Sequence, residues 1–457
     1  MMPTVLPPGP RTPRPVQQLQ WIADPFGYLD RAAARFGHCF STKIAAGGNV
    51  PFVMCSDPSA IQEIFALGPD RSLSGRINAF LSDFFGDNSI LLLDGAPHKR
   101  ARKLLMPPFH GERMRAYGNL ICQIARDVYS QLNAGDRVIA RQLMQTITLR
   151  VIIRAVFGLS DERAETELLQ WLDINRSPAG AAIVFLRFLR QDLGAWSPWG
   201  QFVRRRERTR SMLQVEIDAR RQHGDFSGDD ILTMLLQARD EEGMPLDDVE
   251  IVDELLTLLV AGHETTATAL AWACYWVHRD PSVRTQLLDE LKALGPDPDP
   301  SAIARAPYLS AVCNEALRIY PVVPIAVPRI LTQAATIGDR EYPNGSILVP
   351  CIYLAHRNPD LYPDPERFCP ERFLDRQYGP GEFLPFGGGS RRCIGYALAL
   401  TEMKLVLAML MLHVNFELAE PEPVLPSRRG VTLAPATGVR MTVLSPTSDR
   451  AVAAVTS

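Results

Sequence analysis

A single cysteine stands in a glycine-rich loop directly before a long apolar segment, and its surroundings favour reactive or metal-binding chemistry. Residues 386–395 read FGGGSRRCIG and are followed by YALALTEMKLVLAMLML. Three consecutive glycines allow a tight turn, and the free N–H groups of a helix N-terminus favour an anion at Cys393. Two adjacent arginines act in the same direction. These residues alone allow a reactive cysteine, a metal thiolate or an inert buried cysteine.

A second polar group interrupts an apolar helix pattern at residues 261–266, AGHETT. Gly262 costs a helix about 1 kcal/mol and a buried carboxylate costs more, so these residues need a functional reason. A threonine bonded to its i−4 carbonyl would explain Thr265 alone, but not the whole group. A zinc-protease H-E-x-x-H motif is excluded because Ala267 occupies the second histidine position.

A third group consists of Glu315 and Arg318, three residues apart in a predicted helix, and Arg372 further along the chain. Such an i, i+3 pair is most often an exposed ion pair worth a few tenths of a kcal/mol.

These segments are similar to the signature motifs of the cytochrome P-450 (haem-thiolate monooxygenase) family. The loop matches F-x-x-G-x-R-x-C-x-G at every fixed position, residues 261–266 match A-G-x-[D/E]-T-[T/S], and E-x-x-R and P-x-R-F elements occur in the family's order over nearly the whole chain. The resemblance implies haem b (iron protoporphyrin IX) with Cys393 as the axial thiolate of the iron, and places Phe386 and Gly395 in the haem-binding loop.

The same resemblance implies roles for the other residues. Ala261 and Gly262 leave space for dioxygen. Thr265 hydrogen-bonds the oxygen where it is activated, and Glu264 helps to relay protons from solvent. Glu315, Arg318 and Arg372 form a buried charge triad that locks the cysteine loop and is structural, not catalytic. The haem propionates are expected to be bound by His98, Arg102, Arg329 and Arg391.

The helices and strands that must position these residues are predicted from the spacing of apolar residues and from the prolines and glycines that interrupt it. A helix of more than 30 residues is predicted from about Leu246 to His278, apolar on most faces and therefore inside the core. Further helices are predicted at 24–36, 282–293, 301–319 and through most of 94–257, with small sheets near the N-terminus, between 321 and 353, and over 431–444. The predicted fold is mainly α with small β-sheets, the P-450 fold, with haem between the long central helix and the helix after the cysteine.

Length and composition set limits on organisation and location. The chain has 457 residues, 46% of them hydrophobic, and a net charge of −3, so no basic surplus suggests nucleic acid binding. We expect one haem domain over 1–457, with an extended proline-rich arm at 1–18. No secretory signal or run of about 18 apolar residues is evident, which favours a soluble bacterial protein in the cytoplasm without a transmembrane segment.

Electrons must come from outside, since no flavin or iron–sulfur module fits in the remaining sequence. By resemblance the partner is an external ferredoxin or flavodoxin with its NAD(P)H-dependent reductase. It is expected to dock on the cysteine side, near Lys99, Arg100, Lys103 and Arg392.

The substrate is expected to be lipophilic, for example a long-chain fatty acid, hydrocarbon or terpenoid, which is hydroxylated or epoxidised. Segments such as LPPGP and AHRNP look most like the lipid-hydroxylating branch of the family. The apolar residues expected to line the pocket are Phe80, Phe84, Phe85, Ile90, Phe185, Leu186, Val323 and Ile325.

Three alternatives remain open: a peroxygenase of the same fold, an isomerase or dehydratase, and a non-catalytic haem sensor. The first two would typically lack the acid–threonine pair at Glu264 and Thr265, and no appended signalling domain supports the third.

Overall fold

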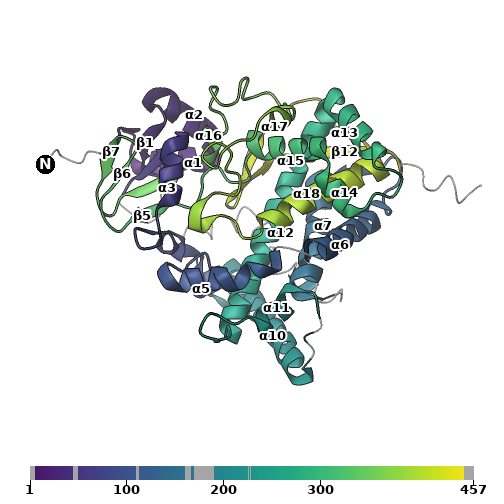
Figure 1. The fold of residues 1–457 in the computed structure, drawn as a ribbon, viewed down its shortest axis with the longest axis horizontal. Coiled ribbons are helices and arrows are strands. Elements are labelled where there is room, and N and C mark those ends of the chain that lie inside the picture. The colour runs from purple at the N-terminus through teal and green to yellow at the C-terminus, as the bar shows by residue number, and fades with distance from the viewer. Residues whose placement is uncertain are drawn as a thin grey trace, which may run out of the picture.

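The computed structural model describes residues 6–44, 50–109, 113–159, 166–168, 190–224, 226 and 228–446. Helices make up most of this part of the chain (Figure 1). The largest sheet lies toward the N-terminal end, and the last strand of the chain lies on the opposite side, among the helices. The predicted mainly α fold with small β-sheets is confirmed.

The helices surround one long central helix. The α-helices are α1 (Arg14–Ala23), α2 (Pro25–Phe36), α3 (Pro58–Ala66), α4 (Ser82–Phe85), α5 (Gly95–Leu105), α6 (Arg113–Tyr129), α7 (Ala140–Phe157), α10 (Pro198–His223), α11 (Ile231–Gln237), α12 (Asp248–Arg279), α13 (Pro281–Ala293), α14 (Pro300–Arg305), α15 (Pro307–Ile319), α16 (Ile352–Ala355), α17 (Arg372–Asp375) and α18 (Tyr396–His413). Short 3-10 helices are η1 (Gly75–Leu81), η2 (Pro107–Phe109), η5 (Gly194–Trp196) and η6 (Gly389–Arg391).

The strands are short and join distant parts of the sequence. They are β1 (Cys39–Thr42), β2 (Phe52–Cys55), β3 (Ser72–Leu73), β4 (Arg137–Ile139), β5 (Arg329–Leu331), β6 (Ala335–Ile337), β7 (Arg340–Tyr342), β8 (Ile347–Pro350), β9 (Val414–Leu418), β10 (Pro426–Arg429), β11 (Thr432–Pro435) and β12 (Arg440–Pro446).

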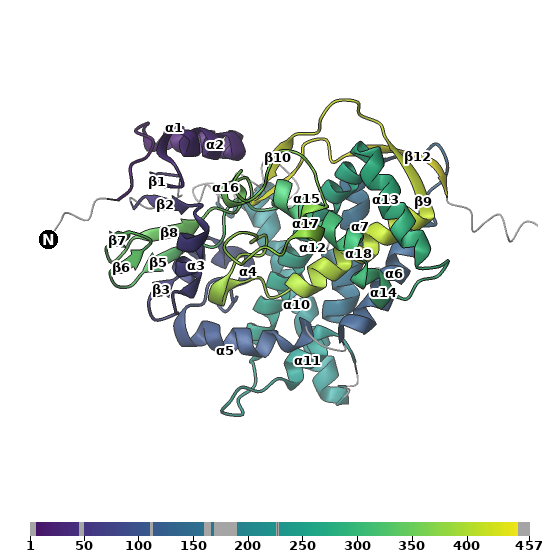
Figure 2. The same ribbon diagram turned by 45° about the horizontal axis from the view of Figure 1, so that its top comes forward.

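The largest sheet has five strands in the order β1-β2-β8-β5-β3. Its centre is the parallel pair β2 and β8, in register from Phe52↔Ile347 to Cys55↔Pro350, and β5 pairs antiparallel with β8. Figure 2 shows α1 and α2 along one side of β1 and β2. The strands β4, β12 and β9 form a second sheet, and β10–β11 and β6–β7 form separate two-stranded sheets. The main sheet therefore fixes β5, and with it Arg329, relative to the N-terminal region.

Helix α12 passes through the core, as the sequence predicts, and packs against α7, α15 and α18 (Figure 1). A capping box between Asp247 and Glu250 begins it, and the backbone N–H of Asp280 bonds the Trp276 carbonyl at its end. Trp272 is fully buried and donates from its indole N–H to the Leu433 carbonyl at 3.1 Å. Both ends and one face of α12 are thus anchored, which holds the central polar residues in place.

Four expectations from the sequence are wrong in detail. The N-terminal arm does not stay extended to residue 18, because α1 begins at Arg14 with a proline in its first turn. The helix predicted at 301–319 is two helices that meet at Ala306, since Pro307 disfavours helical backbone in the residue before it. No strand forms over 321–328, a segment rich in proline. Within the described residues, one helix, α18, does meet the length and composition of a membrane span, but it packs inside the helical core.

Candidate active site

The cysteine loop runs from Phe386 through η6 to the start of α18, and packing explains its glycines. Gly387 and Gly389 have φ angles of 65° and 62°. A Cβ atom on Gly388 would approach the Phe65 ring to 2.3 Å, and one on Gly389 would approach the Phe65 carbonyl oxygen to 2.2 Å. The backbone N–H of Cys393 donates to the Phe386 carbonyl at 3.0 Å. The loop is therefore pressed against α3 and presents Cys393 in one orientation.

The Cys393 thiol has two properties that define its surroundings. Its side chain is exposed, yet the surrounding protein raises its pKa by burial, and both hold for a group on the floor of a hollow. Burial outweighs the Gly395 backbone, Arg102 and Arg392, which lower the pKa. Of the two adjacent arginines credited from the sequence, Arg392 contributes, and Arg102 of α5 is an addition from the fold. The expectation that the loop alone favours a thiolate is thus incomplete. A cation on the sulfur, such as haem iron, supplies what is needed to deprotonate it.

Three arginines and one histidine from three elements converge beside this loop: His98 and Arg102 of α5, Arg329 of β5 and Arg391 of η6. Burial and the charges of Arg391, Arg102 and Arg329 lower the pKa of His98 to about 4. Burial and Arg391 also lower the pKa of Arg329 to about 10. These shifts show that positive charges crowd one another at this place.

Among the described residues, few acidic side chains balance the positive charge of this cluster. Asp94 is bound to Arg391 at 2.6 Å. The other arginine hydrogen bonds go to neutral acceptors, such as the carbonyl oxygens of Arg392 and Gly388 and the Ser74 hydroxyl. Within the described residues the Nε atom of the buried Arg329 has no hydrogen-bond partner. An unpartnered buried donor in a crowd of cations fits a ligand with carboxylates, which the two propionates of haem provide.

The polar centre of α12 has one face that is not fully covered by neighbouring elements. Ala261 is exposed and Thr265 half-buried, although the helix is buried on either side of them. The Thr265 hydroxyl donates to the Ala261 carbonyl at 2.5 Å, the i−4 bond considered above as an alternative explanation of this residue. Its lone pairs stay available as acceptors. We call the row of Leu258, Ala261 and Thr265 the open face of α12.

Glu264 and Gly262 face α7 instead. Glu264 accepts 2.6 Å hydrogen bonds from Arg141 and from Gln145, two α7 residues that the sequence analysis missed. Their i, i+4 spacing places both side chains on one face of α7, but the helix carries other polar residues, so the sequence alone did not single them out. A Cβ atom on Gly262 would come within 2.6 Å of the Ile152 Cδ1 atom, so a larger residue here would require the Ile152 side chain to move where α12 packs on α7.

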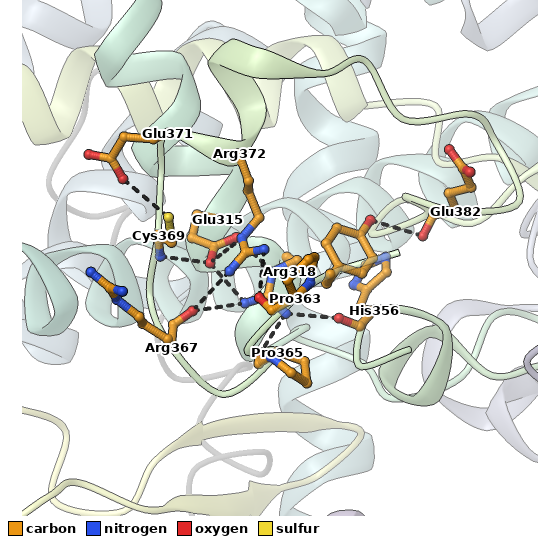
Figure 3. Close-up of polar contacts among 11 residues, drawn as sticks. Glu315, Arg318, His356, Pro363, Pro365, Arg367, Cys369, Glu371, Arg372 and Glu382 are labelled. Carbon is orange, nitrogen blue, oxygen red and sulfur yellow. Dashed lines mark hydrogen bonds and ion pairs between the residues drawn. The ribbon is translucent and has the colours of Figure 1, made fainter. Parts of the chain in front are cut away.

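The predicted charge triad is present and fully buried at its centre. Glu315 binds Arg318 at 2.6 and 2.8 Å and Arg372 at 3.2 Å (Figure 3). Glu315 also accepts the backbone N–H of Cys369 at 2.9 Å. Arg318 has 0% side-chain exposure, and its guanidinium lies over the Tyr362 ring. A guanidinium buried this completely would be strongly destabilising without these hydrogen-bond and ion-pair partners.

His356 connects the triad to the cysteine loop. Its carbonyl accepts from Arg318 at 2.8 Å, and its Nε2 accepts from the Leu384 backbone N–H at 2.9 Å. Leu384 in turn accepts the backbone N–H of Gly387 at 2.9 Å. Burial and Arg318 lower the pKa of His356 to about 3, which keeps Nε2 an acceptor. A continuous series of contacts therefore links the triad to the cysteine loop, which supports the expectation that the triad holds the loop in place.

Two of the four basic residues expected at the partner surface are already paired within the chain. Arg100 binds Asp240 at 2.7 Å and Glu250 at 2.9 Å, and Lys103 pairs with Glu241. The segment around 240 thus satisfies both cations, which the sequence could not reveal. Lys99 and Arg392 are exposed, and Arg392 lies 4.0 Å from the centroid of the Tyr396 ring.

The predicted pocket residues fall into three groups. Phe84 and Phe85 belong to the main core, where Phe84 contacts the rings of Trp199 and Phe202 on α10. Phe80, Val323 and Ile325 are half-buried and Ile90 is buried. Phe185 and Leu186 lie outside the described residues.

Known proteins resemble this chain in sequence and in fold over nearly its full length. The family model "Cytochrome P450" matches residues 7–440. "Putative cytochrome P450 135B1" of Mycobacterium tuberculosis is 35% identical over 442 residues, which is 96% of this chain and 91% of the relative. "Putative cytochrome P450 138" of Mycobacterium bovis is 32% identical over 437 residues, 95% of this chain and 96% of the relative.

A solved structure described as "Retinoic acid bound cyanobacterial CYP120A1" superposes with a TM-score of 0.82 at 25% identity, and the match covers 96% of this chain and 99% of that one. The sequence, the fold and the convergence of Cys393 with three arginines and His98 agree. The chain belongs to the cytochrome P450 family, whose members bind haem b.

Proposed function

We propose that this chain is a single-domain monooxygenase that uses dioxygen and electrons from an external ferredoxin or flavodoxin to hydroxylate or epoxidise a lipophilic substrate in the cytoplasm. The observation that carries the proposal is the arrangement at the middle of α12. Thr265 lies on the open face, and the adjacent Glu264 is held by Arg141 and Gln145. Bound haem with a thiolate ligand would supply oxygen activation.

The residues of this chain would bind the haem and deliver protons. Cys393 would ligate the iron, and His98, Arg102, Arg329 and Arg391 would bind the propionates. Glu264 is 24% exposed and can exchange protons with solvent, while its two α7 partners fix its position. The Thr265 hydroxyl can pass a proton on when it rotates away from the Ala261 carbonyl. Proton delivery distinguishes this proposal from a peroxygenase, an isomerase and a sensor, none of which requires it.

A lipophilic substrate is supported by apolar, half-buried side chains such as Phe80, Val323 and Ile325, and by the retinoic acid named for the cyanobacterial structure. The fatty-acid or lipid-hydroxylating branch stays a prediction from the sequence motifs.

Replacement of Thr265 by alanine tests the proposal. We expect product formed per dioxygen consumed to fall by about tenfold or more, with hydrogen peroxide taking its place, because proton delivery loses its hydroxyl. Thr268→Ala is the matched control, since Thr268 lies on the same helix, fully buried. Oxygen consumption and product are measured together with any accepted substrate. Unchanged coupling in Thr265→Ala would argue against the proposed reaction.

Charge reversal at Arg392 tests the electron-transfer surface. In Arg392→Glu we expect the second-order rate of reduction by an acidic ferredoxin to fall by about tenfold at low salt, because the exposed cation would steer an anionic partner. The difference should shrink as ionic strength rises. Arg31→Glu on α2 makes the same charge change at a 62% exposed side chain and serves as the control. Equal rates and salt dependence in all three proteins would exclude this surface.

A further inference from the structure

The open face of α12 continues into a buried carboxyl group for which the proposed reaction has no use. Glu254, Leu258, Ala261 and Thr265 are separated by four, three and four residues, so they form one row along the helix. Leu258 and Thr265 are half-buried and Ala261 is exposed, so no neighbouring element fully covers this part of the row. Glu254 stands at the end of the row, two turns from Ala261.

The Glu254 carboxyl is unpartnered. Its side chain belongs to a residue only 2% exposed, and neither carboxyl oxygen has a hydrogen-bond partner among the described residues. Burial raises the pKa of Glu254 well above its usual value, and the Ile90 backbone N–H, outside hydrogen-bonding geometry, lowers it slightly in return. A buried polar group without partners destabilises the fold by about 1–3 kcal/mol. The fold alone therefore gives no reason for this residue.

Other residues already perform the structural work around it. Asp253 binds Arg210 at 2.6 Å and accepts the backbone N–H of Asn88 at 3.1 Å. Thr257 donates to Ser89 at 2.8 Å. The segment before Ile90 is thus attached to α12 without any contribution from the Glu254 side chain.

The charges around Glu254 select the kind of group that it would bind. The charged groups that act on its pKa are Asp253 and Glu250, both acidic, and each of these is itself paired with an arginine, Arg210 and Arg100. Among the described residues no cation is bound to the Glu254 carboxyl itself, so an ammonium group would find an unpartnered acid there, whereas a carboxylate would gain no partner. Ile90, one of the predicted pocket residues, is its neighbour and connects it to the haem side, since the Ile90 carbonyl accepts from Arg391 at 3.1 Å.

We propose that Glu254 determines specificity by binding a basic amine of a lipophilic substrate, an inference that rests on the proposed monooxygenase function. On binding, the carboxylic acid loses its proton to solvent and the carboxylate pairs with the ammonium group. Seven residues separate Glu254 from Ala261, about 10 Å along the helix axis. The substrate nitrogen should therefore lie about 10 Å from the carbon that is oxidised.

The experiment compares three ligands of equal chain length on the haem-loaded protein: decylamine, decanol and decanoate. Dissociation constants are measured by calorimetry, and the haem spectrum reports which end faces the iron. The wild-type protein should prefer decylamine and show a high-spin shift, because Glu254 holds the nitrogen away from the iron. In Glu254→Leu and Glu254→Gln, decylamine should bind about tenfold to a hundredfold more weakly. Its nitrogen should then ligate the iron and give a low-spin spectrum.

The control is Glu402→Gln on α18, a second carboxyl that is 1% exposed and has an unpartnered oxygen. It should keep the wild-type preference for decylamine. Glu254→Leu should melt no lower than the wild type, because it removes an unpartnered buried carboxyl.

Equal affinity and the same spectral type for decylamine in wild type and Glu254→Leu would overturn the role of Glu254. The proposed function would survive that result if decanol still shifts the spin state and is oxidised. Failure of all three ligands to perturb the spectrum or to be oxidised would count against the proposed function itself.

Discussion

Replacement of Glu315 by leucine is expected to destabilise the protein by about 3–5 kcal/mol and to release haem. The substitution leaves Arg318, with 0% side-chain exposure, and the nearly buried Arg372 without their shared carboxylate. It also removes the acceptor of the Cys369 backbone N–H. Because Arg318 leads through His356 and Leu384 to Gly387, the disturbance should reach the cysteine loop.

Thermal unfolding and the ratio of haem to protein after gel filtration measure this effect. Glu366→Gln is the control, since Glu366 binds Arg357 at 3.0 Å but is 84% exposed, and such pairs contribute about 0–1 kcal/mol. A variant Glu315→Leu that melts like the wild type and keeps its haem would show that the triad does not support the loop.

Replacement of Cys393 by serine is expected to reduce turnover to background. A serine hydroxyl is neutral at neutral pH and cannot donate electron density to iron as a thiolate does. Arg102, Arg329 and Arg391 would still attract the propionates, so some haem should remain bound. The loss would thus be one of chemistry and not only of cofactor.

Cys369→Ser is the matched control for this substitution. The Cys369 thiol contacts Glu371 at 3.4 Å and is half-buried, but it lies beside the triad and not in the loop. Haem content and product formation are compared for both variants. Wild-type turnover by Cys393→Ser with normal haem content would show that position 393 does not carry the reaction.

The features that were predicted well from the sequence are those that depend on residues close together in the chain. The cysteine loop, the E-x-x-R pair and the central helix each depend on spacing within one segment, and the long helix was placed within two residues at its start. Helix-breaking residues explain the errors in helix boundaries, because Pro307 divides the segment 301–319, which was predicted as one helix, into two.

Residues that depend on contacts between distant segments could not be predicted. Nothing near Glu264 in the sequence indicates that Arg141 holds it, more than 100 positions away. The pairing of Arg100 with Asp240 likewise requires the fold, and it removes a cation that the sequence assigned to partner docking. Phe84 shows the same limit, because an aromatic residue in a core and one in a pocket look identical until α10 is packed against it.

The ferrous carbon monoxide spectrum of the purified haem-loaded protein tests the central claim most directly, because the absorption maximum depends on the ligand opposite carbon monoxide. A thiolate from Cys393 predicts a strongly red-shifted Soret band. A Soret band at the ordinary position, typical of a histidine ligand, would contradict the assignment of Cys393 and with it the proposed function.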